Sequence, residues 1–310
     1  MSLSEKTKRW LKENGNTSLK GKTVLVTGAN SGVGFKTAEI AVYLGAKTIL
    51  ACRNRHKALK ARKKLQHDHP GAVIAVMQLD LADLSSINSF AEELRHNETD
   101  IDVFVNNAGV FHQPEKKTAD GFDLVIGTNY IGTYYVSERV LPYLSTLPHE
   151  VFYINTVSII HKIATVDYED FYYEKNKRYR AFAVYARSKL CLARYTYAKA
   201  RRYKRSNVRI LMNHPGVTLT PMGLNAYGKI VRKLSGIVAP LTNSPEKSAL
   251  SLAYILAHDV PPGSIIGPNK GLGGWGYPVK NRILRRVKEG ADELISFTER
   301  ELKKQGINPL

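Results

Sequence analysis

Residues 23–34 read TVLVTGANSGVG, and this stretch decides the fold. Its first five residues are apolar or β-branched, as in a buried strand, and glycines follow at positions 28, 32 and 34. Glycine permits a tight turn, and a helix that starts there offers free N–H groups and its dipole to an anion. The stretch therefore predicts a strand, a turn and a helix over residues 34–44. A tight connection alone would also explain the glycines, but their place at the first strand-to-helix junction favours a phosphate-binding site.

Apolar strands and amphipathic helices alternate along the rest of the chain. Further strands are expected at 47–52, 73–79, 101–105, 150–155, 207–212 and near 264–266, with helices at 55–66, 84–95, about 120–144, 180–203 and 245–258. Continuous apolar strands between amphipathic helices indicate a parallel sheet that is covered on both faces. We therefore predict a single α/β domain with a doubly wound parallel sheet, the Rossmann fold, and ligands at the carboxyl ends of its strands.

The domain is expected to occupy residues 21–270, with helical extensions at both ends. Residues 1–20 form the N-terminal extension, residues 217–244 a substrate lid, and residues 271–310 a basic C-terminal extension. No apolar run approaches the ~18 residues that cross a bilayer, and the polar first residues do not resemble a secretory signal. The two cysteines, Cys52 and Cys191, have no spacing typical of a disulfide framework or a zinc site. We therefore expect a cytoplasmic protein with a metal-free site.

The chain is strongly basic, with a formal net charge of +19. Residues 175–209 contain thirteen Lys or Arg residues and no acidic residue. Such a field attracts phosphorylated cofactors, anionic membrane surfaces or nucleic acid. A solvated basic face is the simplest explanation for most of it. Peripheral contact with an anionic membrane stays open as an alternative, and nucleic acid is the least favoured partner.

The end of the second predicted strand indicates which nucleotide binds. The sequence there is ACRNR, residues 51–55, and no acidic residue occurs between Glu39 and Asp68. A site for NAD places Asp or Glu about 20 residues after the glycine turn, where it binds the ribose 2′-hydroxyl. Arginine suits a 2′-phosphate instead, because it offers two parallel hydrogen bonds and the opposite charge. We predict NADP(H) as the cofactor, with Arg53 at the 2′-phosphate and Asn54 and Arg55 beside it.

A tyrosine and a lysine share one face of the helix predicted at 180–203. Tyr185 and Lys189 are four residues apart, so their side chains lie one above the other. A nearby cation favours the phenolate and so lowers the pKa of a phenol, which makes it a usable proton donor or acceptor. Pairs of this kind also occur by chance on solvated helix faces. Other motifs must decide between the two interpretations.

Several short motifs occur in a fixed order between residues 21 and 220. They are Thr27, Gly28, Gly32 and Gly34 at the turn, Asn106-Asn107-Ala108-Gly109 after the fourth strand, Asn129, Ser158, Tyr185 with Lys189, and Pro215-Gly216. Each motif is weak by itself, but their order and spacing resemble the short-chain dehydrogenase/reductase family. The glycine turn, the Ala-Cys-Arg strand end and the long interval from Ser158 to Tyr185 look most like the retinol dehydrogenase and WW-domain oxidoreductase-like branch.

The resemblance implies a role for each motif residue. Tyr185 would be the general acid in carbonyl reduction or the general base in alcohol oxidation, with Lys189 lowering its pKa and binding the nicotinamide ribose. Ser158 would hydrogen-bond the substrate oxygen, and Asn129 would hold a water that connects Lys189 to solvent. The implied cofactor-binding residues are Gly28, Asn30, Ser31, Gly32, Val33 and Gly34 at the pyrophosphate, Asp80 and Leu81 at the adenine, Asn107, Ala108 and Gly109 at the adenosine, and Pro215, Gly216, Val217, Thr218 and Thr220 at the nicotinamide. Taken singly, Ser158 is equally compatible with a strand-end cap and Asn129 with a helix start.

The resemblance implies an NADP(H)-dependent oxidoreductase that interconverts an alcohol and an aldehyde or ketone, and family members usually form homodimers or homotetramers. The apolar composition of the predicted lid, with Ile159, Ile160, His161 and His214 near the expected pocket, indicates an apolar substrate. The alternative is a regulatory protein that binds NADP(H) without turnover. The complete Asn-Ser-Tyr-Lys set argues against it, because a sensor needs no proton relay.

Two features depart from the family's usual pattern. Val157 stands where a second serine is common, next to Ser158. The segment 168–179 lengthens the interval between Ser158 and Tyr185, and we expect it to shape the substrate entrance. Its aromatic side chains are also compatible with ordinary packing.

Overall fold

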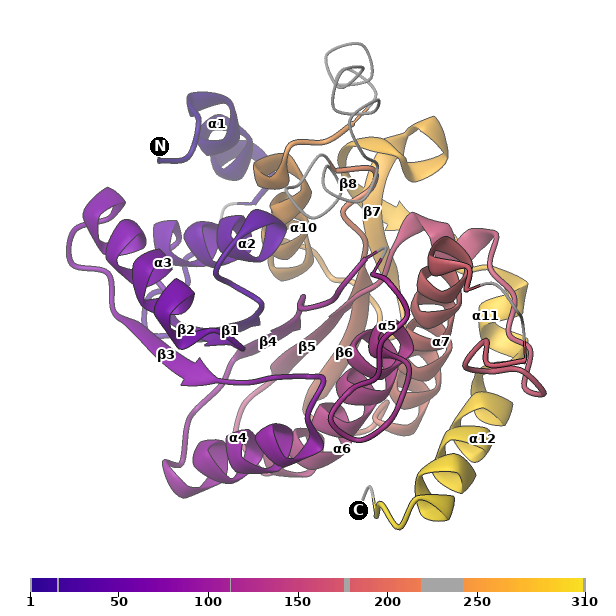
Figure 1. Cartoon of the computed structure of the whole chain (residues 1–310). Coiled ribbons are helices and arrows are strands. Elements are labelled where there is room, and N and C mark those ends of the chain that lie inside the picture. The colour runs from indigo at the N-terminus through magenta and orange to yellow at the C-terminus, as the bar shows by residue number, and fades with distance from the viewer. Residues whose placement is uncertain (1, 16, 112, 176–178, 219–241, 309–310) are drawn as a thin grey trace.

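The computed structural model describes residues 2–15, 17–111, 113–175, 179–218 and 242–308. Within these ranges, eight strands form one sheet in the order β3-β2-β1-β4-β5-β6-β7-β8 (Figure 1). Every neighbouring pair is parallel except β7 and β8. The doubly wound parallel sheet predicted from the sequence is thus confirmed. The strands are β1 (Thr23–Thr27), β2 (Lys47–Cys52), β3 (Ile74–Gln78), β4 (Val103–Asn106), β5 (Val151–Thr156), β6 (Val208–Asn213), β7 (Ile265–Lys270) and β8 (Trp275–Asn281).

Helices cover both faces of the sheet (Figure 1). One face carries α2 (Gly32–Tyr43), α3 (Arg55–Asp68) and α10 (Pro245–Ala257), and the other carries α4 (Leu84–His96), α6 (Thr133–Leu144) and α7 (Ala181–Arg202). Side chains alternate along a strand, so β1 serves both layers. Val24 and Val26 pack toward α2 and α10, whereas Leu25 packs toward α4 and α6. Burial on both faces is the reason that β1 reads as a continuous apolar run.

The helix expected at about 120–144 is three consecutive helical segments. Asp123 caps α5 (Leu124–Ile126), since its Oδ1 accepts hydrogen bonds from the N–H groups of Val125 and Ile126 at 2.9 and 2.8 Å. A π-helical segment, η1 (Gly127–Gly132), leads into α6. A Cβ atom at Gly132 would lie 2.0 Å from the carbonyl oxygen of Leu81, so only glycine fits there. The wider π-helical turn contains Asn129, which the sequence singled out.

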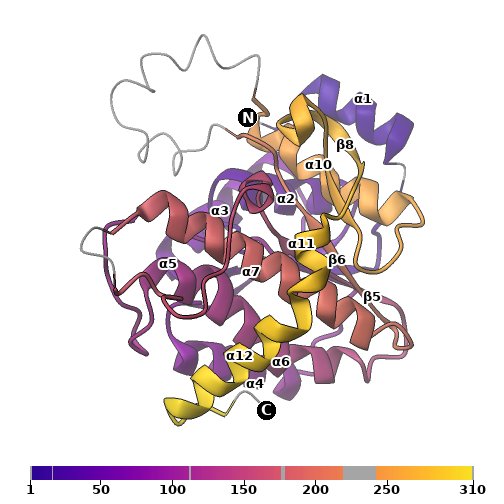
Figure 2. The same ribbon diagram turned by 90° about the vertical axis from the view of Figure 1, so that its right-hand side faces the viewer.

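The C-terminal part of the chain contributes to the sheet, which the sequence did not predict. Residues Trp275–Asn281 form β8, antiparallel to β7, so part of the expected extension at 271–310 is an edge strand. Gly276, Pro278 and Lys280 weaken the strand signal, and Pro278 is tolerated because β8 lies at the edge of the sheet. After β8 come α11 (Arg285–Glu289) and α12 (Ala291–Lys304), both of which contact α7 (Figure 2).

The N-terminal helix is α1 (Glu5–Asn14), which packs against α10. Trp10 and Leu11 lie in one apolar cluster with Ala253 of α10. The predicted lid at 217–244 falls mostly outside the described residues, and so does Thr220. None of the helices in the described ranges has the length and apolar character that a membrane span needs.

The basic run at 175–209 is not one solvated face. Arg187, Lys189 and Lys199 are all buried on α7, with exposed fractions of 4, 5 and 7%. Arg187 donates hydrogen bonds to the carbonyl groups of Asp170 and Phe171. The solvated-face interpretation concerned most of the run: six of its cations are exposed, namely Lys175, Arg180, Arg201, Arg202, Lys204 and Arg205, whereas these three are not. The physical reason is a separate partner for each: Arg187 is held by the segment before α7, Lys189 by the carbonyl group of Thr156 on β5, and Lys199 by the Glu138 carboxylate on α6.

Candidate active site

The glycine turn after β1 is locked to the segment after β4. The Thr27 hydroxyl accepts hydrogen bonds from the N–H groups of Asn107 and Ala108 at 3.0 and 2.9 Å. Gly28 has a φ of +67°, and a Cβ atom there would lie 2.9 Å from the Cα atom of Ala108. At Gly34, a Cβ atom would lie 2.3 Å from Nδ2 of Asn107. Both glycines are therefore needed for close contact between two chain segments.

The first turn of α2 is open toward an anion. Ser31 precedes the helix, its side chain makes no capping hydrogen bond, and the first turn contains no acidic residue. Ser31 is exposed, and Asn30, Gly32 and Val33 are half-buried. The free N–H groups at a helix start carry a partial positive charge and bind phosphate oxygens. This turn fits the pyrophosphate of a dinucleotide.

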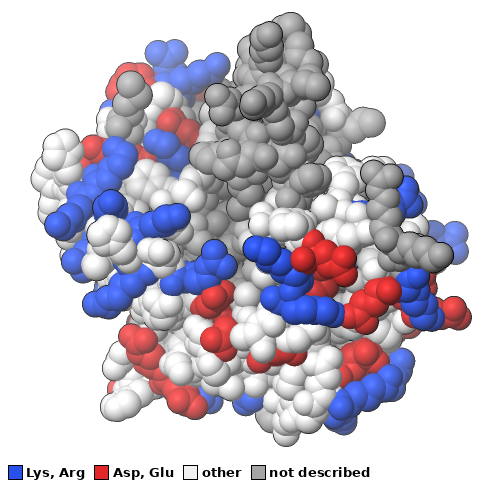
Figure 3. Space-filling model, viewed as in Figure 1, with Lys and Arg blue, Asp and Glu red and all other residues white. Residues whose placement is uncertain are grey.

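The residues after β2 present positive charge next to this turn. Arg53 is exposed and makes no ion pair with a carboxylate of the described residues. Asn54 has a structural task, because its Oδ1 accepts a hydrogen bond from the N–H of Lys57 at 2.9 Å and so caps α3. Figure 3 shows Lys and Arg side chains gathered over α3. The Lys and Arg residues of α3 are Arg55, Lys57, Lys60, Arg62, Lys63 and Lys64.

Asp80 and Leu81 follow β3 in a tight turn before α4. The carboxylate of Asp80 accepts a hydrogen bond from the N–H of Ala82 at 3.0 Å, and the Asp80 N–H donates to the Ser86 hydroxyl at 2.9 Å. The Leu81 side chain is buried in the core, and its backbone packs against Gly132 of η1. The adenine-side residues named from the sequence therefore lie at the end of β3, with much of Asp80 engaged in the turn itself.

Lys189 is buried at the end of β5. Its ammonium group donates a hydrogen bond to the carbonyl oxygen of Thr156 at 2.8 Å, and only 5% of the residue is exposed. Burial lowers the pKa of Lys189 from its ordinary 10.5 to about 8. A Cβ atom on Gly109 would lie 3.5 Å from this ammonium and 2.9 Å from Oδ1 of Asn129. Gly109 thus marks the place where α7, η1 and the segment after β4 meet.

Asn129 connects these three elements. Its Oδ1 accepts from the N–H of Val110 at 2.7 Å, and its Nδ2 donates to the Val110 carbonyl at 2.9 Å and to the Ser188 hydroxyl at 3.1 Å. Both amide donors are therefore used within the protein. A water bound by Asn129 would have to use the second lone pair of Oδ1 or the backbone carbonyl. The side chain itself fixes the position of Val110 relative to α7.

Tyr185 lies one helical turn before Lys189 on α7 and is half-buried. Its ring packs edge-on against Phe111, with centroids 4.6 Å apart and an interplanar angle of 72°. Ser158 precedes a short 3₁₀ helix, η2 (Ile159–Lys162), which contacts α7. The Ser158 hydroxyl accepts a long hydrogen bond, 3.5 Å, from the N–H of Ile160, and no described residue accepts its own hydrogen.

Two histidines on the site segments are buried. His161 is 2% exposed and its Nδ1 lies at hydrogen-bond distance from the Ser158 carbonyl. His214 follows β6, is 1% exposed, and has no hydrogen-bond partner among the described residues for either ring nitrogen. Burial, together with the charges of His161 and Lys162, lowers the pKa of His214 to about 3. His214 is therefore neutral near pH 7.

The Pro215–Gly216 segment is held by two neighbouring elements. Gly216 has a φ of +75°, and a Cβ atom there would lie 2.3 Å from the carbonyl oxygen of Gly274. The N–H of Val217 donates to that same carbonyl at 2.7 Å. The hydroxyl groups of Thr218 and Ser248 lie 2.8 Å apart, which connects the segment to α10. The segment is thus placed by Gly274, just before β8, and by α10, both remote in sequence.

The described part of the segment 168–179 packs against the protein. Phe171 is 3% exposed, and its ring lies 4.7 Å from that of Phe297 on α12. The Tyr179 hydroxyl donates to the Asp123 carboxylate at 2.9 Å. The packing interpretation holds for Phe171. The entrance role expected for this segment stays a prediction, and residues 176–178 lie outside the described ranges.

Sequence reasoning missed the partners that orient the candidate residues. Thr27 was noted only as part of the glycine motif, although its hydroxyl holds Asn107 and Ala108. The acceptor for Lys189 is the backbone carbonyl of Thr156, which no side-chain pattern can reveal. Phe111 packs on Tyr185 from a segment with no periodic signal.

Comparison with known proteins places these features in a family. Residues 22–166 match the model described as short chain dehydrogenase. Mouse retinol dehydrogenase 14 is 37% identical over 218 residues, which cover 67% of this chain and 64% of that protein. Human retinol dehydrogenase 13 is 34% identical over 243 residues, 77% of this chain and 72% of that protein. The chain belongs to the short-chain dehydrogenase family.

Within this family, the relatives support the retinol dehydrogenase-like branch, as the motifs indicated. The alignment spans slightly less than two thirds of mouse retinol dehydrogenase 14. Solved structures agree on the fold. An uncharacterized protein from Mycobacterium paratuberculosis has a TM-score of 0.74 and 28% identity, over 93% of this chain and 95% of that one. The L-sorbose reductase of Gluconobacter frateurii, solved with NADPH and L-sorbose, has a TM-score of 0.64 at 18% identity, over 80% of this short-chain dehydrogenase and 95% of the reductase.

Proposed function

We propose that the chain is an NADP(H)-dependent oxidoreductase that interconverts an alcohol and an aldehyde or ketone. One observation carries the proposal: the buried cation Lys189 lies one helical turn from the half-buried phenol of Tyr185, at the carboxyl end of the sheet. A buried ammonium group is costly, and its retention at such a place is typical of a catalytic site. Membership in a family of dehydrogenases supports the same reaction class.

The residues on the chain fit a phosphorylated dinucleotide. The uncapped first turn of α2 can hold the pyrophosphate. Arg53 is exposed, free of ion pairs with described carboxylates and followed by the basic face of α3, so it can bind a 2′-phosphate. Lys189, next to Gly109, can bind the ribose hydroxyls. When bound, the nicotinamide ring supplies the hydride acceptor or donor.

The chain's own residues handle the proton. In reduction, the Tyr185 hydroxyl donates its proton to the substrate oxygen, and in oxidation the phenolate takes that proton back. The Ser158 hydroxyl donates a hydrogen bond to the same oxygen and stabilises its negative charge as the reaction proceeds. The Lys189 ammonium stabilises the phenolate form of Tyr185. Asn129 holds the Gly109–Val110 segment against α7 and so fixes the position of this segment relative to Lys189.

An apolar substrate is supported by exposed apolar side chains on two of the site segments. Ile163 follows η2 and is 70% exposed, and Val217 follows Pro215–Gly216 and is 46% exposed. Large exposed hydrophobic residues next to a site favour contact with an apolar ligand. The relatives named for retinol, an apolar alcohol, agree with this substrate class.

The test uses Tyr185→Phe and a matched control on the same helix, Tyr197→Phe. The purified protein is assayed with NADPH against a panel of apolar aldehydes and ketones, and NADPH affinity is measured by fluorescence titration. We expect the Tyr185 variant to lose at least about 1,000-fold in turnover, within the range for a catalytic proton donor, and to keep its NADPH affinity. The Tyr197 variant should match the wild type. Appreciable residual turnover in the Tyr185 variant contradicts the assignment, and tight NADPH binding without turnover of any compound favours a regulatory protein.

We also propose a homodimer or homotetramer in the cytoplasm. Cys52 and Cys191 are buried thiols, which is compatible with a reducing compartment. Sedimentation velocity of the purified chain tests the subunit number directly.

A further inference from the structure

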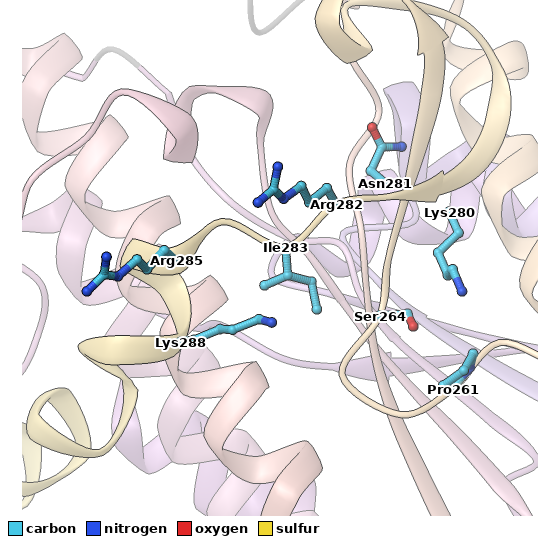
Figure 4. A pocket seen from close by; sticks show the side chains of 8 residues that line it. All are labelled: Pro261, Ser264, Lys280, Asn281, Arg282, Ile283, Arg285 and Lys288. Carbon is cyan, nitrogen blue, oxygen red and sulfur yellow. The ribbon is translucent and has the colours of Figure 1, made fainter.

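A cavity of about 450 Å³ lies between the segment that leads into β7 and the segment that joins β8 to α11 (Figure 4). It shares no residue with the candidate active site. Its lining residues are Pro261, Ser264, Lys280, Asn281, Arg282, Ile283, Arg285 and Lys288. Four of them are cations and none is acidic, so the cavity has a strongly positive lining.

Most of this charge is not neutralised within the described part of the protein. Arg285 pairs with Glu289 one turn along α11. Lys280, Arg282 and Lys288 make no ion pair with a described carboxylate. Like charges around one hollow repel each other, and an anion in that hollow relieves the repulsion. The charge pattern therefore favours an anionic ligand.

The side chains also converge on one place. Figure 4 shows Lys288 reaching from α11 and Lys280 descending from β8, both toward the side of the cavity where Ser264 lies, whereas Arg282 and Arg285 point elsewhere. Ser264 is only 7% exposed. Its hydroxyl makes no hydrogen bond with another described residue and is turned into the same space.

We propose that this cavity binds a phosphate monoester, with Lys280, Lys288 and Ser264 as its direct ligands. Two ammonium groups balance the two charges of a phosphate monoester, and the hydroxyl supplies a third hydrogen bond. Arg282, which has no ion pair with a described carboxylate, raises the local concentration of anions by its charge. The apolar Ile283 at the wall can contact the organic part of the ligand. The inference does not depend on the proposed oxidoreductase activity.

The experiment is a calorimetric titration of the full chain with inorganic phosphate at constant ionic strength. Lys280→Gln/Lys288→Gln removes both cations, and Lys60→Gln/Lys63→Gln removes the same charge from the exposed face of α3 as a control. Arg53→Ala removes the arginine proposed to bind the 2′-phosphate of the cofactor. We expect the wild type, the α3 control and the Arg53 variant each to bind phosphate at this cavity with the same affinity. The Lys280/Lys288 variant should bind at least about tenfold more weakly, since it loses two charge-assisted hydrogen bonds.

Ser264→Ala serves as a second variant that leaves the charge unchanged, and we expect a several-fold loss of phosphate affinity. The inference is overturned if the Lys280/Lys288 variant binds phosphate like the α3 control. It is also overturned if Arg53→Ala abolishes all phosphate binding, because the cofactor site would then account for the signal.

Two further arms separate the sources of the phosphate group. One titrates glycerol 3-phosphate, and the other measures sedimentation with phosphatidylcholine vesicles that contain or lack phosphatidate. Binding to phosphatidate vesicles that depends on Lys280 and Lys288 identifies a lipid headgroup. Binding of the soluble ester alone identifies a soluble phosphorylated compound.

Discussion

Replacement of Lys189 by Met should abolish turnover and stabilise the cofactor-free protein. The pKa of Lys189 is about 8 instead of 10.5, because burial disfavours its charged form. This difference corresponds to a cost of about 3 kcal/mol whenever the folded protein carries the charge. The substitution removes this cost, but it also removes the hydrogen bond to the Thr156 carbonyl, which offsets about 1 kcal/mol of the stabilisation. The expected net stabilisation is about 2 kcal/mol near neutral pH, or about 3 °C in Tm for a chain of this size.

The pH dependence has a definite sign. The folded pKa lies below the unfolded one, so the unfolded chain binds more protons between about pH 8 and 10.5. The cost of the Lys189 charge is therefore present in full below about pH 8 and fades as the pH rises toward 10.5. The wild type should approach the stability of the Lys189→Met variant over that interval. Urea unfolding followed by tryptophan fluorescence, at several pH values on both sides of 8, measures the difference.

Lys199→Met is the matched control, because Lys199 is a second buried lysine on α7. Its ammonium pairs with the Glu138 carboxylate at 2.6 Å, and the Tyr195 hydroxyl donates to the other oxygen of Glu138 at 2.7 Å. Removing this lysine leaves a buried carboxylate without its cation, which should cost about 3–5 kcal/mol. The two substitutions should thus change stability in opposite directions. If Lys189→Met destabilises the protein at every pH, the charge of Lys189 is compensated and the reasoning fails.

Two further outcomes are expected from the structure. Arg53→Asp should shift the preference from NADPH toward NADH by at least about tenfold, because a carboxylate repels the 2′-phosphate and accepts a hydrogen bond from a 2′-hydroxyl. The measurement is the ratio of the kcat/KM values for NADPH and NADH, with Lys63→Asp as the control. An unchanged ratio in the Arg53 variant would refute the cofactor assignment. His214, with a folded pKa of about 3 against an ordinary 6.5, should lower the stability of the wild type as the pH falls through that interval, by about 2 kcal/mol at about pH 5. His214→Leu should remove this part of the acid sensitivity. If the urea midpoint falls by the same amount in both proteins between about pH 7 and 5, His214 is not the group responsible.

Local sequence was sufficient for the elements that are buried on both faces. The strands β1, β2, β4, β5 and β6 are short apolar runs between amphipathic helices, and such runs have few alternatives in a chain of this class. The edge strand β8 was missed because Gly276 and Pro278 interrupt it, and pairing with β7 alone makes it a strand. The π-helical segment at Asn129 was also missed, since no residue pattern distinguishes it from an ordinary helix.

The amino-acid sequence by itself determined the fold class, the family and the identity of the candidate residues, because glycine spacing and the order of Asn129, Ser158, Tyr185 and Lys189 are local properties of the chain. Only the tertiary structure decided which cations are buried, what holds them and where the unpaired ones gather. Lys189 bonds a backbone carbonyl on β5, and Lys280 and Lys288 line one cavity with Ser264, which comes from a separate segment. Burial and contact between distant segments depend on packing, and the period of a single helix or strand contains no information about them.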